Sequence, residues 1–387
     1  MFKTRYAYFM KRKPETTAIH GVYRGKIKPE EPLISPEIRS TVFRHHPDHQ
    51  KRGNQYTRNE NPNRAELEST VAALEGGEEC AAFSSGMAAT SALFQSFGPG
   101  DHILIPEDLY HGTRAFLSEI MSRWGLEIEP VAMENPKRVE ASIKPNTKLL
   151  WVETPSNPLL LITDIGAIAE IAKKHDCLLA VDNTWPSPIN TRPIEHGADL
   201  VMHSSTKYLG GHSDILGGVI VARKDCEQFE GIRQVQRMAG AVPSPADCWL
   251  MVRSIKTLTH RVKAHNENAL KVAEFLDDHA GVRAVYYPGL KNHKGHDVAK
   301  KQMTGFGGML SFEVEGDRND ALKVINGSEL IIPATSLGGV ESTWEHRVSV
   351  ESEGSPTSPN LIRMSVGIEH IDDLIGDLQK ALLAVEK

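Results

Sequence analysis

Short apolar runs alternate with amphipathic stretches along much of the chain, from about residue 64 to residue 223. The short runs, such as "CAAF" and "LLAV", are apolar at every position, which is typical of strands in a parallel sheet that is buried on both faces. The stretches between them, such as "RAELESTVAALEGG", repeat their apolar residues with the period of an α-helix. This alternation predicts a large, doubly wound α/β domain with a mostly parallel sheet.

The same pattern assigns the segments of this domain to strands and helices. We expect strands at residues 80–85, 101–107, 147–154, 177–183, 199–205 and 217–223. We expect helices at residues 64–77, 86–98, 112–125 and 165–176.

After about residue 250 the pattern changes. A long helical stretch over residues 251–279 is followed by separate apolar strands and by a final amphipathic helix from residue 371. These later strands are expected at residues 284–289, 307–316 and 361–367. The arrangement predicts a smaller α+β domain that packs on the first.

The first 60 residues are rich in Arg, Lys, His and Pro and show no sustained period. A segment of this length without secondary structure is uncommon inside a compact monomer. We therefore expect an arm that folds over a neighbouring subunit or that carries function itself. The predicted division of the chain is 1–60, 61–250 and 251–387.

Composition narrows the class of partner. The 387 residues contain 44 Lys and Arg against 50 Asp and Glu, so the chain as a whole does not attract nucleic acid or anionic membranes. No run is long and apolar enough to cross a bilayer, and the basic start lacks the apolar segment of a signal peptide. The 4 cysteines form no CxxC pair, which indicates reduced thiols and no metal site. We expect a cytoplasmic protein that acts on a small molecule.

The residues just after each strand carry the candidate chemistry, because ligands of a parallel sheet bind beyond the carboxyl ends of its strands. Ser85, Gly86 and Met87 follow the first expected strand and open a helix. Free backbone N–H groups and the helix dipole make such a position a seat for phosphate. A plain turn of small residues is the alternative interpretation of this segment.

Asp182 and Lys207 follow two consecutive strands, so a carboxylate and an amine are expected at one edge of the sheet. Each has a simpler interpretation alone, because Asp often caps a turn and a loop Lys is often solvated. Together with a phosphate seat they match the needs of pyridoxal phosphate: an amine for a Schiff base, a carboxylate that keeps the pyridine nitrogen protonated, and phosphate donors. Ser204 and Thr206, beside the lysine, are further donors.

These residues lie in motifs that resemble the Cys/Met-metabolism family of pyridoxal-phosphate (PLP) enzymes, which includes cystathionine γ-synthase, cystathionine β- and γ-lyases, methionine γ-lyase and the homoserine-ester sulfhydrylases. In chain order the motifs are "YTRNENPNR", "SSGMAA", "DLYHGT", "ETPSNP", "VDNTW", "HSSTKYLGGHSD", "SLGGVES" and "RMSVGIE". The resemblance extends over nearly the whole chain from about residue 15. It implies a PLP-dependent transferase-like fold of the aspartate aminotransferase type, pyridoxal 5′-phosphate as cofactor and an amino acid as substrate.

The resemblance also implies roles for single residues. Lys207 would carry the cofactor and move protons, Asp182 would pair with the pyridinium nitrogen, and Tyr110 would stack on the ring and assist proton transfer. The residues implied to hold the phosphate end of the cofactor are Ser85, Gly86, Met87, Ser204 and Thr206, with Tyr56 and Arg58 from a neighbouring subunit. The residues implied to bind the substrate are Arg363, as a clamp for its carboxylate, with Ser336, Asn157 and Thr335. A site shared in this way makes the protein a homodimer or homotetramer.

Outside the resemblance, simpler interpretations remain for two of these residues. Tyr110 could merely cap a helix, and Arg363 could pair with a surface carboxylate. Two other positions depart from particular branches of the family. Gly112 stands where methionine γ-lyases typically have cysteine, and Thr335 stands where cystathionine γ-lyases and γ-synthases usually have a glutamate that meets the far end of the substrate.

The segment "ESTWEHRVSVESEGSPTSPN" departs most from the usual family pattern "ESLxExPxxMTH". One interpretation places Glu345, His346 and Arg347 near the mouth of the pocket, where they would recognise an unusual leaving group. The other interpretation is a solvated loop in which Trp344 is buried.

We therefore predict a PLP-dependent lyase that catalyses α,γ- or α,β-elimination on a cystathionine-like or otherwise γ-substituted amino acid. The alternatives are a γ-replacement transferase of the cystathionine γ-synthase or O-acyl-homoserine sulfhydrylase type, and a γ-lyase of an oxygen-linked homoserine derivative such as canavanine. A dinucleotide-binding protein is disfavoured because no GxGxxG follows the first strand. A non-catalytic relative is disfavoured because Lys207, Asp182, Tyr110 and Arg363 are all present.

Overall fold

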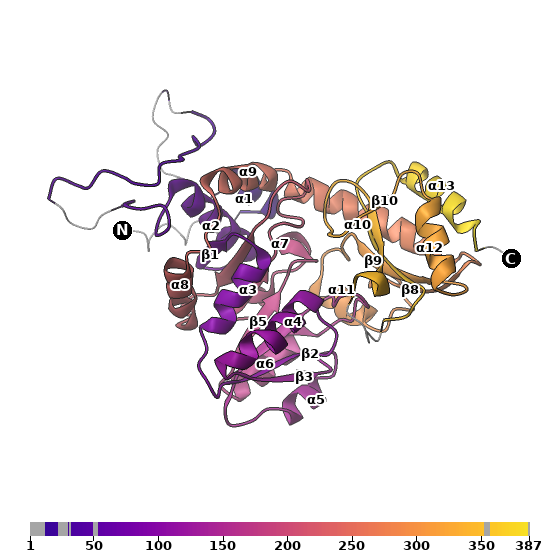
Figure 1. The fold of residues 1–387 in the computed structure, drawn as a ribbon, viewed down its shortest axis with the longest axis horizontal. Coiled ribbons are helices and arrows are strands. Elements are labelled where there is room, and N and C mark those ends of the chain that lie inside the picture. The colour runs from indigo at the N-terminus through magenta and orange to yellow at the C-terminus, as the bar shows by residue number, and fades with distance from the viewer. Residues whose placement is uncertain (1–11, 22–29, 31, 49–52, 352–356, 386–387) are drawn as a thin grey trace.

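Two sheets organise the chain in the computed structural model, which describes residues 12–21, 30, 32–48, 53–351 and 357–385 (Figure 1). A seven-stranded sheet is built from the chain up to residue 222, and a five-stranded sheet is built from the chain from residue 282 onward. In Figure 1 the elements of the five-stranded sheet, in orange and yellow, lie at the opposite end of the molecule from the N-terminal arm.

The seven-stranded sheet is mostly parallel. In spatial order its strands are β1 (Glu79–Phe83), β7 (Gly218–Ala222), β6 (Leu200–His203), β5 (Leu178–Asp182), β4 (Thr147–Glu153), β2 (His102–Pro106) and β3 (Glu127–Val131). Only the two pairs that involve β7 are antiparallel. β7 reverses direction because the segment between it and β6 contains no crossover helix. The predicted doubly wound α/β fold is thus confirmed.

One face of this sheet is covered by α3 (Gly86–Gln95), α4 (His111–Glu119) and α8 (Gln228–Ala239). Strand residues such as Phe83 and Trp151 pack against these helices in a single hydrophobic cluster. The close burial of so many large apolar side chains fixes this face of the sheet.

The other face is covered by α2 (Pro62–Glu75), α6 (Ile165–Lys174) and α9 (Pro245–Ile255). Its clusters contain the alternate strand residues, for example Val181 and Val201. Because consecutive strand residues point to opposite faces, each strand must be apolar throughout, as the sequence indicates. Shorter elements complete this part of the chain: η2 (Met121–Trp124), α5 (Pro136–Ala141), α7 (Ser187–Asn190) and η3 (Pro193–His196).

The sequence pattern does not predict β3, because Glu127, Glu129 and Pro130 interrupt its apolar residues. β3 is an edge strand of the sheet, where charged residues and proline are tolerated since one side pairs with no neighbour.

The helix expected at 251–279 is wrong as a single element. The chain forms α9 and then α10 (Leu258–Asp277), with a break at Lys256 and Thr257. The carbonyl of Ser254 explains the break, because it accepts hydrogen bonds from the Thr257 hydroxyl and from the guanidinium of Arg261. The helix expected at 112–125 likewise divides into α4 and η2.

The five-stranded sheet is mostly antiparallel. Its order is β10 (Ile332–Pro333), β11 (Thr343–His346), β12 (Leu361–Ser365), β9 (Met309–Val314) and β8 (Val282–Tyr286), and only β10 and β11 are parallel. Helices α10, α12 (Arg318–Gly327) and α13 (Ile371–Leu382) bury its apolar side chains. The remaining elements are α11 (His296–Gln302) and η4 (Arg347–Val350).

Within its described residues, the N-terminal arm contains a helix that the sequence pattern does not predict. Helix α1 (Pro14–His20) begins with proline at its first position and buries Thr17 and Ala18. The arm's predicted contact with a neighbouring subunit and the boundaries at residues 60 and 250 stay predictions. Residues 1–11, 22–29, 31 and 49–52 of the arm lie outside the described residues. Among the described helices, none has the length and apolar character needed to cross a membrane.

Candidate active site

One cavity of about 210 Å³ collects residues from both sheets. Of the residues that the resemblance assigns to the cofactor or the substrate, all but two line this cavity: Ser85, Gly86, Met87, Tyr110, Asn157, Asp182, Ser204, Thr206, Lys207, Thr335, Ser336 and Arg363. The two exceptions are Tyr56 and Arg58. Residues far apart in the sequence therefore meet in one place, at the carboxyl edge of the parallel strands.

The predicted phosphate seat is the start of helix α3. Ser85 is the N-cap, and its hydroxyl accepts the backbone N–H of Ala88 at 3.0 Å. The N–H groups of Gly86 and Met87 belong to the first turn, where no helical carbonyl can accept them. A Cβ on Gly86 would lie 2.8 Å from the Cβ of Ser204, so glycine allows this turn to pack directly against the loop that carries Lys207.

Thr206, a phosphate donor by the resemblance, also binds the backbone of its own loop. Its hydroxyl donates to the carbonyl of Gly217 at 3.2 Å and accepts the N–H of the same residue at 3.0 Å. In this structure Thr206 therefore closes the loop between β6 and β7, and its side chain still lines the cavity.

Lys207 lies half-buried in this cavity rather than in a solvated loop. Its Nζ donates a hydrogen bond to Ser336 Oγ at 2.6 Å, which joins the seven-stranded part of the chain to the segment before β11. The pKa of Lys207 is lowered to about 8, mainly by burial and then by the charge of Arg363, while the charge of Glu345 opposes the change. An amine with this pKa is partly neutral near physiological pH.

Asp182 is the last residue of β5. Its Oδ1 accepts both the backbone N–H and the hydroxyl of Thr184. Burial raises the pKa of Asp182, whereas the two hydrogen bonds and the nearby His203 act in the opposite direction by favouring the carboxylate.

Glu153 is a buried residue of the cavity that our sequence analysis missed. It ends β4 and accepts the backbone N–H of Tyr110 at 3.0 Å. Burial, and then the neighbouring Asp182, raise the pKa of Glu153 well above its ordinary value. The signal was present in the sequence, since Glu153 follows an apolar strand in the same way as Asp182.

Tyr110 stands at the N-cap position of α4, but its side chain makes no capping hydrogen bond. The ring is 38% exposed, lines the cavity and meets His111 edge-on with ring centroids 4.7 Å apart. A Cβ at position 112 would lie 2.5 Å from the Tyr110 ring, so Gly112 leaves space that the ring occupies. Tyr110 thus occupies the N-cap position, as the simpler interpretation has it, but its side chain lines the cavity instead of capping the helix.

Arg363 lies in the middle of β12 and is buried. Its guanidinium donates to Asn157 Oδ1 at 3.0 Å and to the carbonyl of Ser336 at 3.4 Å, and it lies 2.6 Å from Glu345 Oε1. Burial lowers the pKa of Arg363 to about 10, so the side chain remains a cation at neutral pH. Its acidic partner is buried, which excludes the interpretation of a surface ion pair. Thr335 lies nearby on the exposed side of the cavity lining.

The segment Trp344–Arg347 is not a solvated loop, because all four of its side chains are buried. Arg347 lines the cavity. His346 instead bonds to Ser349 Oγ and to the carbonyl of Pro359, each at 2.6 Å. Of the three residues expected near the pocket mouth, only Arg347 contributes to the cavity wall, with Glu345 bound to it from behind.

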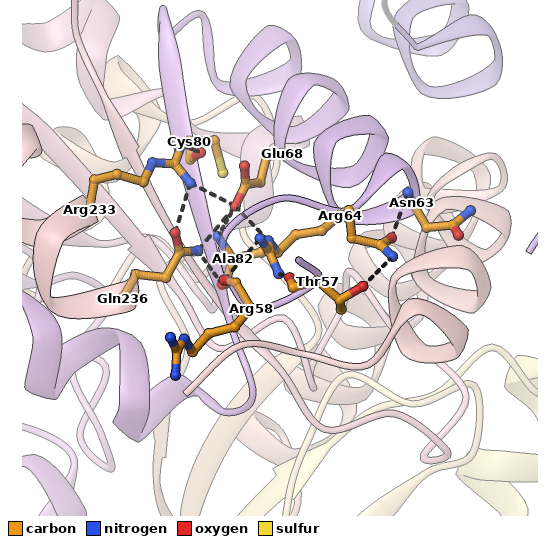
Figure 2. Close-up of polar contacts among 10 residues, drawn as sticks. Thr57, Arg58, Asn63, Arg64, Glu68, Cys80, Ala82, Arg233 and Gln236 are labelled. Carbon is orange, nitrogen blue, oxygen red and sulfur yellow. Dashed lines mark hydrogen bonds and ion pairs between the residues drawn. The ribbon is translucent and has the colours of Figure 1, made fainter. Parts of the chain in front are cut away.

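Tyr56 and Arg58 lie on the exposed surface, away from the cavity of their own chain. The loop that carries them is held from beneath by Arg64 of α2, which donates to the carbonyls of Thr57 at 2.8 Å and Arg58 at 3.3 Å. Figure 2 shows the Arg58 side chain directed away from these contacts.

A buried polar network anchors Arg64 in turn (Figure 2). Glu68 lies 3.8 Å from Arg64 and 2.9 Å from Arg233 of α8. Gln236 donates to Glu68 at 3.1 Å and to the carbonyl of Ala82 in β1 at 2.6 Å. The loop before α2 is therefore fixed to the sheet and to α8 of its own chain.

The cavity's donor set fits pyridoxal phosphate. An amine that is partly neutral, a carboxylate at the end of β5 and the free amides of a helix start are the three groups that this cofactor requires, and all three line one cavity. Asn157, Ser336 and Arg363 add polar groups on the opposite wall, where an amino acid would meet them.

Known proteins resemble the chain over nearly its full length. The family model described as "Cys/Met metabolism PLP-dependent enzyme" matches residues 15–383. A cystathionine γ-synthase of Mycobacterium tuberculosis is 45% identical over 375 residues, which cover 95% of this chain and 96% of that protein. A cystathionine γ-lyase of Bacillus subtilis is 42% identical over 379 residues, 96% of this chain and 99% of that protein.

The fold has an equally similar solved counterpart. The crystal structure of metB from Corynebacterium glutamicum superposes with a TM-score of 0.94 at 43% sequence identity and covers 98% of this chain and 100% of that chain. Since relatives with different reaction names are similarly identical to this chain, identity alone does not select one reaction.

Proposed function

The chain belongs to the Cys/Met metabolism family of PLP-dependent enzymes, and on that premise we propose that it is a lyase that eliminates the γ or β substituent of cystathionine or a similar amino acid. One observation carries the proposal: Lys207, Asp182 and Arg363 line the same cavity although they come from three separate strands or strand ends. An amine, a carboxylate and a buried guanidinium are the groups that this elimination requires.

The residues divide the work of holding the cofactor. Bound pyridoxal phosphate supplies an aldehyde and a protonated ring that draws electrons away from the α-carbon of the substrate. The amides of Gly86 and Met87, with Ser204, would hold its phosphate, and Asp182 would keep its ring nitrogen protonated. Tyr110, which lines the same cavity, would cover the ring.

Lys207 and Arg363 would act on the substrate. Arg363 would clamp the α-carboxylate through charge-assisted hydrogen bonds and so orient the α-carbon. Lys207 Nζ would take the α-proton, because a pKa of about 8 leaves part of the amine population neutral at neutral pH. Ser336 Oγ, at 2.6 Å, holds that nitrogen in place.

Tyr56 and Arg58 would complete the phosphate site of a second copy of the chain. Their exposure and the firm attachment of their loop support this role, since side chains presented on a fixed loop suit recognition by a neighbour. The active form would then be a homodimer or a homotetramer.

A product assay with the purified holoenzyme tests the function. From cystathionine, γ-elimination gives 2-oxobutyrate, ammonia and cysteine, whereas β-elimination gives pyruvate, ammonia and homocysteine. Methionine, O-succinylhomoserine, O-acetylhomoserine and canavanine are offered separately, with and without cysteine. Formation of cystathionine from an O-acylhomoserine and cysteine, faster than any elimination, would make the enzyme a γ-replacement transferase. A protein that binds no pyridoxal phosphate and yields no product would refute the proposal.

A further inference from the structure

One buried carboxylate is shared by two guanidinium groups in the wall of the cavity. Glu345 Oε1 lies 2.6 Å from Arg363 and 2.6 Å from Arg347. Glu345 and Arg363 are register partners on the antiparallel strands β11 and β12, so the geometry of the sheet holds them together. All three side chains are at most 6% exposed.

The carboxylate of Glu345 contacts the Arg363 guanidinium, which is the group that would bind the substrate carboxylate in the proposed function. A substrate carboxylate on Arg363 needs N–H donors of the same guanidinium that Glu345 now contacts. Two carboxylates on one buried guanidinium repel each other strongly, because the interior screens charge poorly. Binding of the substrate must therefore weaken the contact between Glu345 and Arg363.

Arg347 is placed to compensate for that loss. Its Nε donates to Glu351 Oε1 at 2.6 Å, and its Nη1 donates to Glu345 Oε1 at 2.6 Å. The Nη2 atom of the same guanidinium lies 3.4 Å from Nδ1 of His111. Arg347 is thus pinned from two sides and can keep the charge of Glu345 paired after Arg363 has turned to the substrate.

The second oxygen of Glu345 shows that the carboxylate is held incompletely. Oε2 is buried and has no hydrogen-bond partner in the described structure. An unsatisfied buried carboxylate oxygen costs free energy, so Glu345 is bound less firmly than a fully paired carboxylate. A counter-ion that must give way to a substrate is expected to have this property.

We propose that Glu345 is an internal substitute for the substrate carboxylate on Arg363, and that Arg347 retains Glu345 when the substrate displaces it. This inference rests on the proposed role of Arg363. Glu345 and Arg347 are positioning residues, and they set the affinity for α-carboxylates more than the rate of the chemical step.

Two substitutions with opposite effects test the inference. Glu345→Gln removes the competing charge, so the KM for cystathionine and the inhibition constant of propionate should both fall by about tenfold. In Arg347→Met, Arg363 is the one remaining guanidinium that pairs with Glu345 in the described structure. The substrate then displaces Glu345 less easily, so both constants should rise by about tenfold. In both variants kcat should change less than KM. Arg347→Lys, which keeps the charge, should recover most of the loss.

Controls separate this inference from instability and from failure of the proposed function. Glu313→Gln, on β9 of the same sheet but outside the cavity lining, should leave both constants unchanged. The double variant Glu345→Gln/Arg347→Met should show strong non-additivity, because one charge links the two sites. Thermal melting and the absorbance of bound cofactor check that each variant folds.

The outcomes are distinguishable. If Glu345→Gln raises KM, or if both single variants shift KM in the same direction, the inference is wrong. Arg363→Met should raise KM by at least about a hundredfold, since it removes a buried charge-assisted contact. If KM does not rise in this variant, Arg363 does not bind the substrate carboxylate, and the proposed role of Arg363 is wrong. If Arg363→Met has that effect and Glu345→Gln leaves KM unchanged, only the role of Glu345 is refuted.

Discussion

Glu153 and Asp182 are direct register partners at the ends of the parallel strands β4 and β5, so two carboxyl groups meet at the floor of the cavity. Burial and the charge of Asp182 raise the pKa of Glu153 well above its ordinary value. Asp182 is favoured as the charged member, because Thr184 donates two hydrogen bonds to it. Of the two carboxyl groups, Glu153 is therefore the one whose protonated form the site favours more.

This assignment predicts unequal effects of two isosteric substitutions. Asp182→Asn should lower kcat/KM by at least about a hundredfold, because it removes the charge that we propose acts on the cofactor ring. Glu153→Gln should lose far less, since glutamine matches the neutral form of Glu153 and can still accept the N–H of Tyr110. Steady-state kinetics and the absorbance spectrum of the holoenzyme measure both. Equal losses in the two variants would show that Glu153 is ionised.

The same group predicts how stability depends on pH. The folded-state pKa of Glu153 is raised above the ordinary value of 4.5. Its contribution to stability is therefore complete below about pH 4.5 and is lost as the pH rises through the folded-state value. Compared with the wild type, Glu153→Gln should gain stability steadily above pH 4.5. Denaturant unfolding at several pH values tests this, and a constant difference between the two proteins would contradict it.

Lys207 predicts the pH dependence of cofactor capture. Only the neutral amine can attack an aldehyde, and a pKa of about 8 makes about a quarter of the amine neutral at pH 7.5. The rate at which cofactor-free protein captures added pyridoxal phosphate should therefore rise through pH 8 and then level off. Stopped-flow absorbance follows the reaction. Lys207→Ala is the control and should show no covalent capture; a rate that still rises steeply above pH 9.5 would indicate an ordinary lysine.

If Arg58 completes the phosphate site of a second copy, its substitution should impair cofactor binding in the neighbouring subunit. Arg58→Ala should weaken cofactor binding by about tenfold to a hundredfold, the value of a charge-assisted contact to phosphate. Mixing Arg58→Ala and Lys207→Ala subunits should restore about a quarter of the wild-type activity, because half of the dimers are hybrids with one intact site. Arg39→Ala, an exposed arginine on the same arm, serves as the control. No recovery after subunit exchange would argue against a shared site.

Gly112 predicts a steric effect on Tyr110. Gly112→Ala places a methyl group 2.5 Å from the present position of the tyrosine ring, so the ring must move. In a closed core, overpacking of this kind costs about 1–3 kcal/mol, but the partly exposed Tyr110 can give way at a smaller cost. We expect kcat/KM to fall while the melting temperature changes little, because the ring is partly exposed and can rotate outward. A variant that keeps full activity would show that the ring position does not matter for turnover.

The sequence predicts the large sheet and the residues at its carboxyl edge best, because both depend on one simple pattern of apolar strands. The strands of the large sheet were predictable because burial on both faces requires every residue to be apolar, and Asp182 and Lys207 were found because they follow such strands. The hydrophobic pattern does not predict that Arg363 lies in the same cavity as Asp182 and Lys207. Only the resemblance to the family implies it. Only the tertiary structure brings β12 to the edge of the large sheet.

What was missed depends on contacts between distant segments. The break between α9 and α10 arises from hydrogen bonds to the carbonyl of Ser254, which periodicity does not register. The burial of Glu345 and Arg347 could not be predicted either. Charged residues are typical of an exposed loop, and these two are buried because they form an ion pair with each other. Glu153 is different, because the rule that selects residues at the carboxyl end of an apolar strand would also have selected it.

The hydrogen bond from Lys207 to Ser336 crosses 129 residues of sequence and joins two separately built walls of the cavity. In the proposed function, the wall that includes Lys207 and Asp182 would hold the cofactor, and the wall that includes Ser336, Arg347 and Arg363 would meet the substrate. Mutation can therefore remodel the second wall while the first remains intact. Such a division of labour gives an evolutionary route by which one inherited scaffold diversifies into enzymes with different reactions.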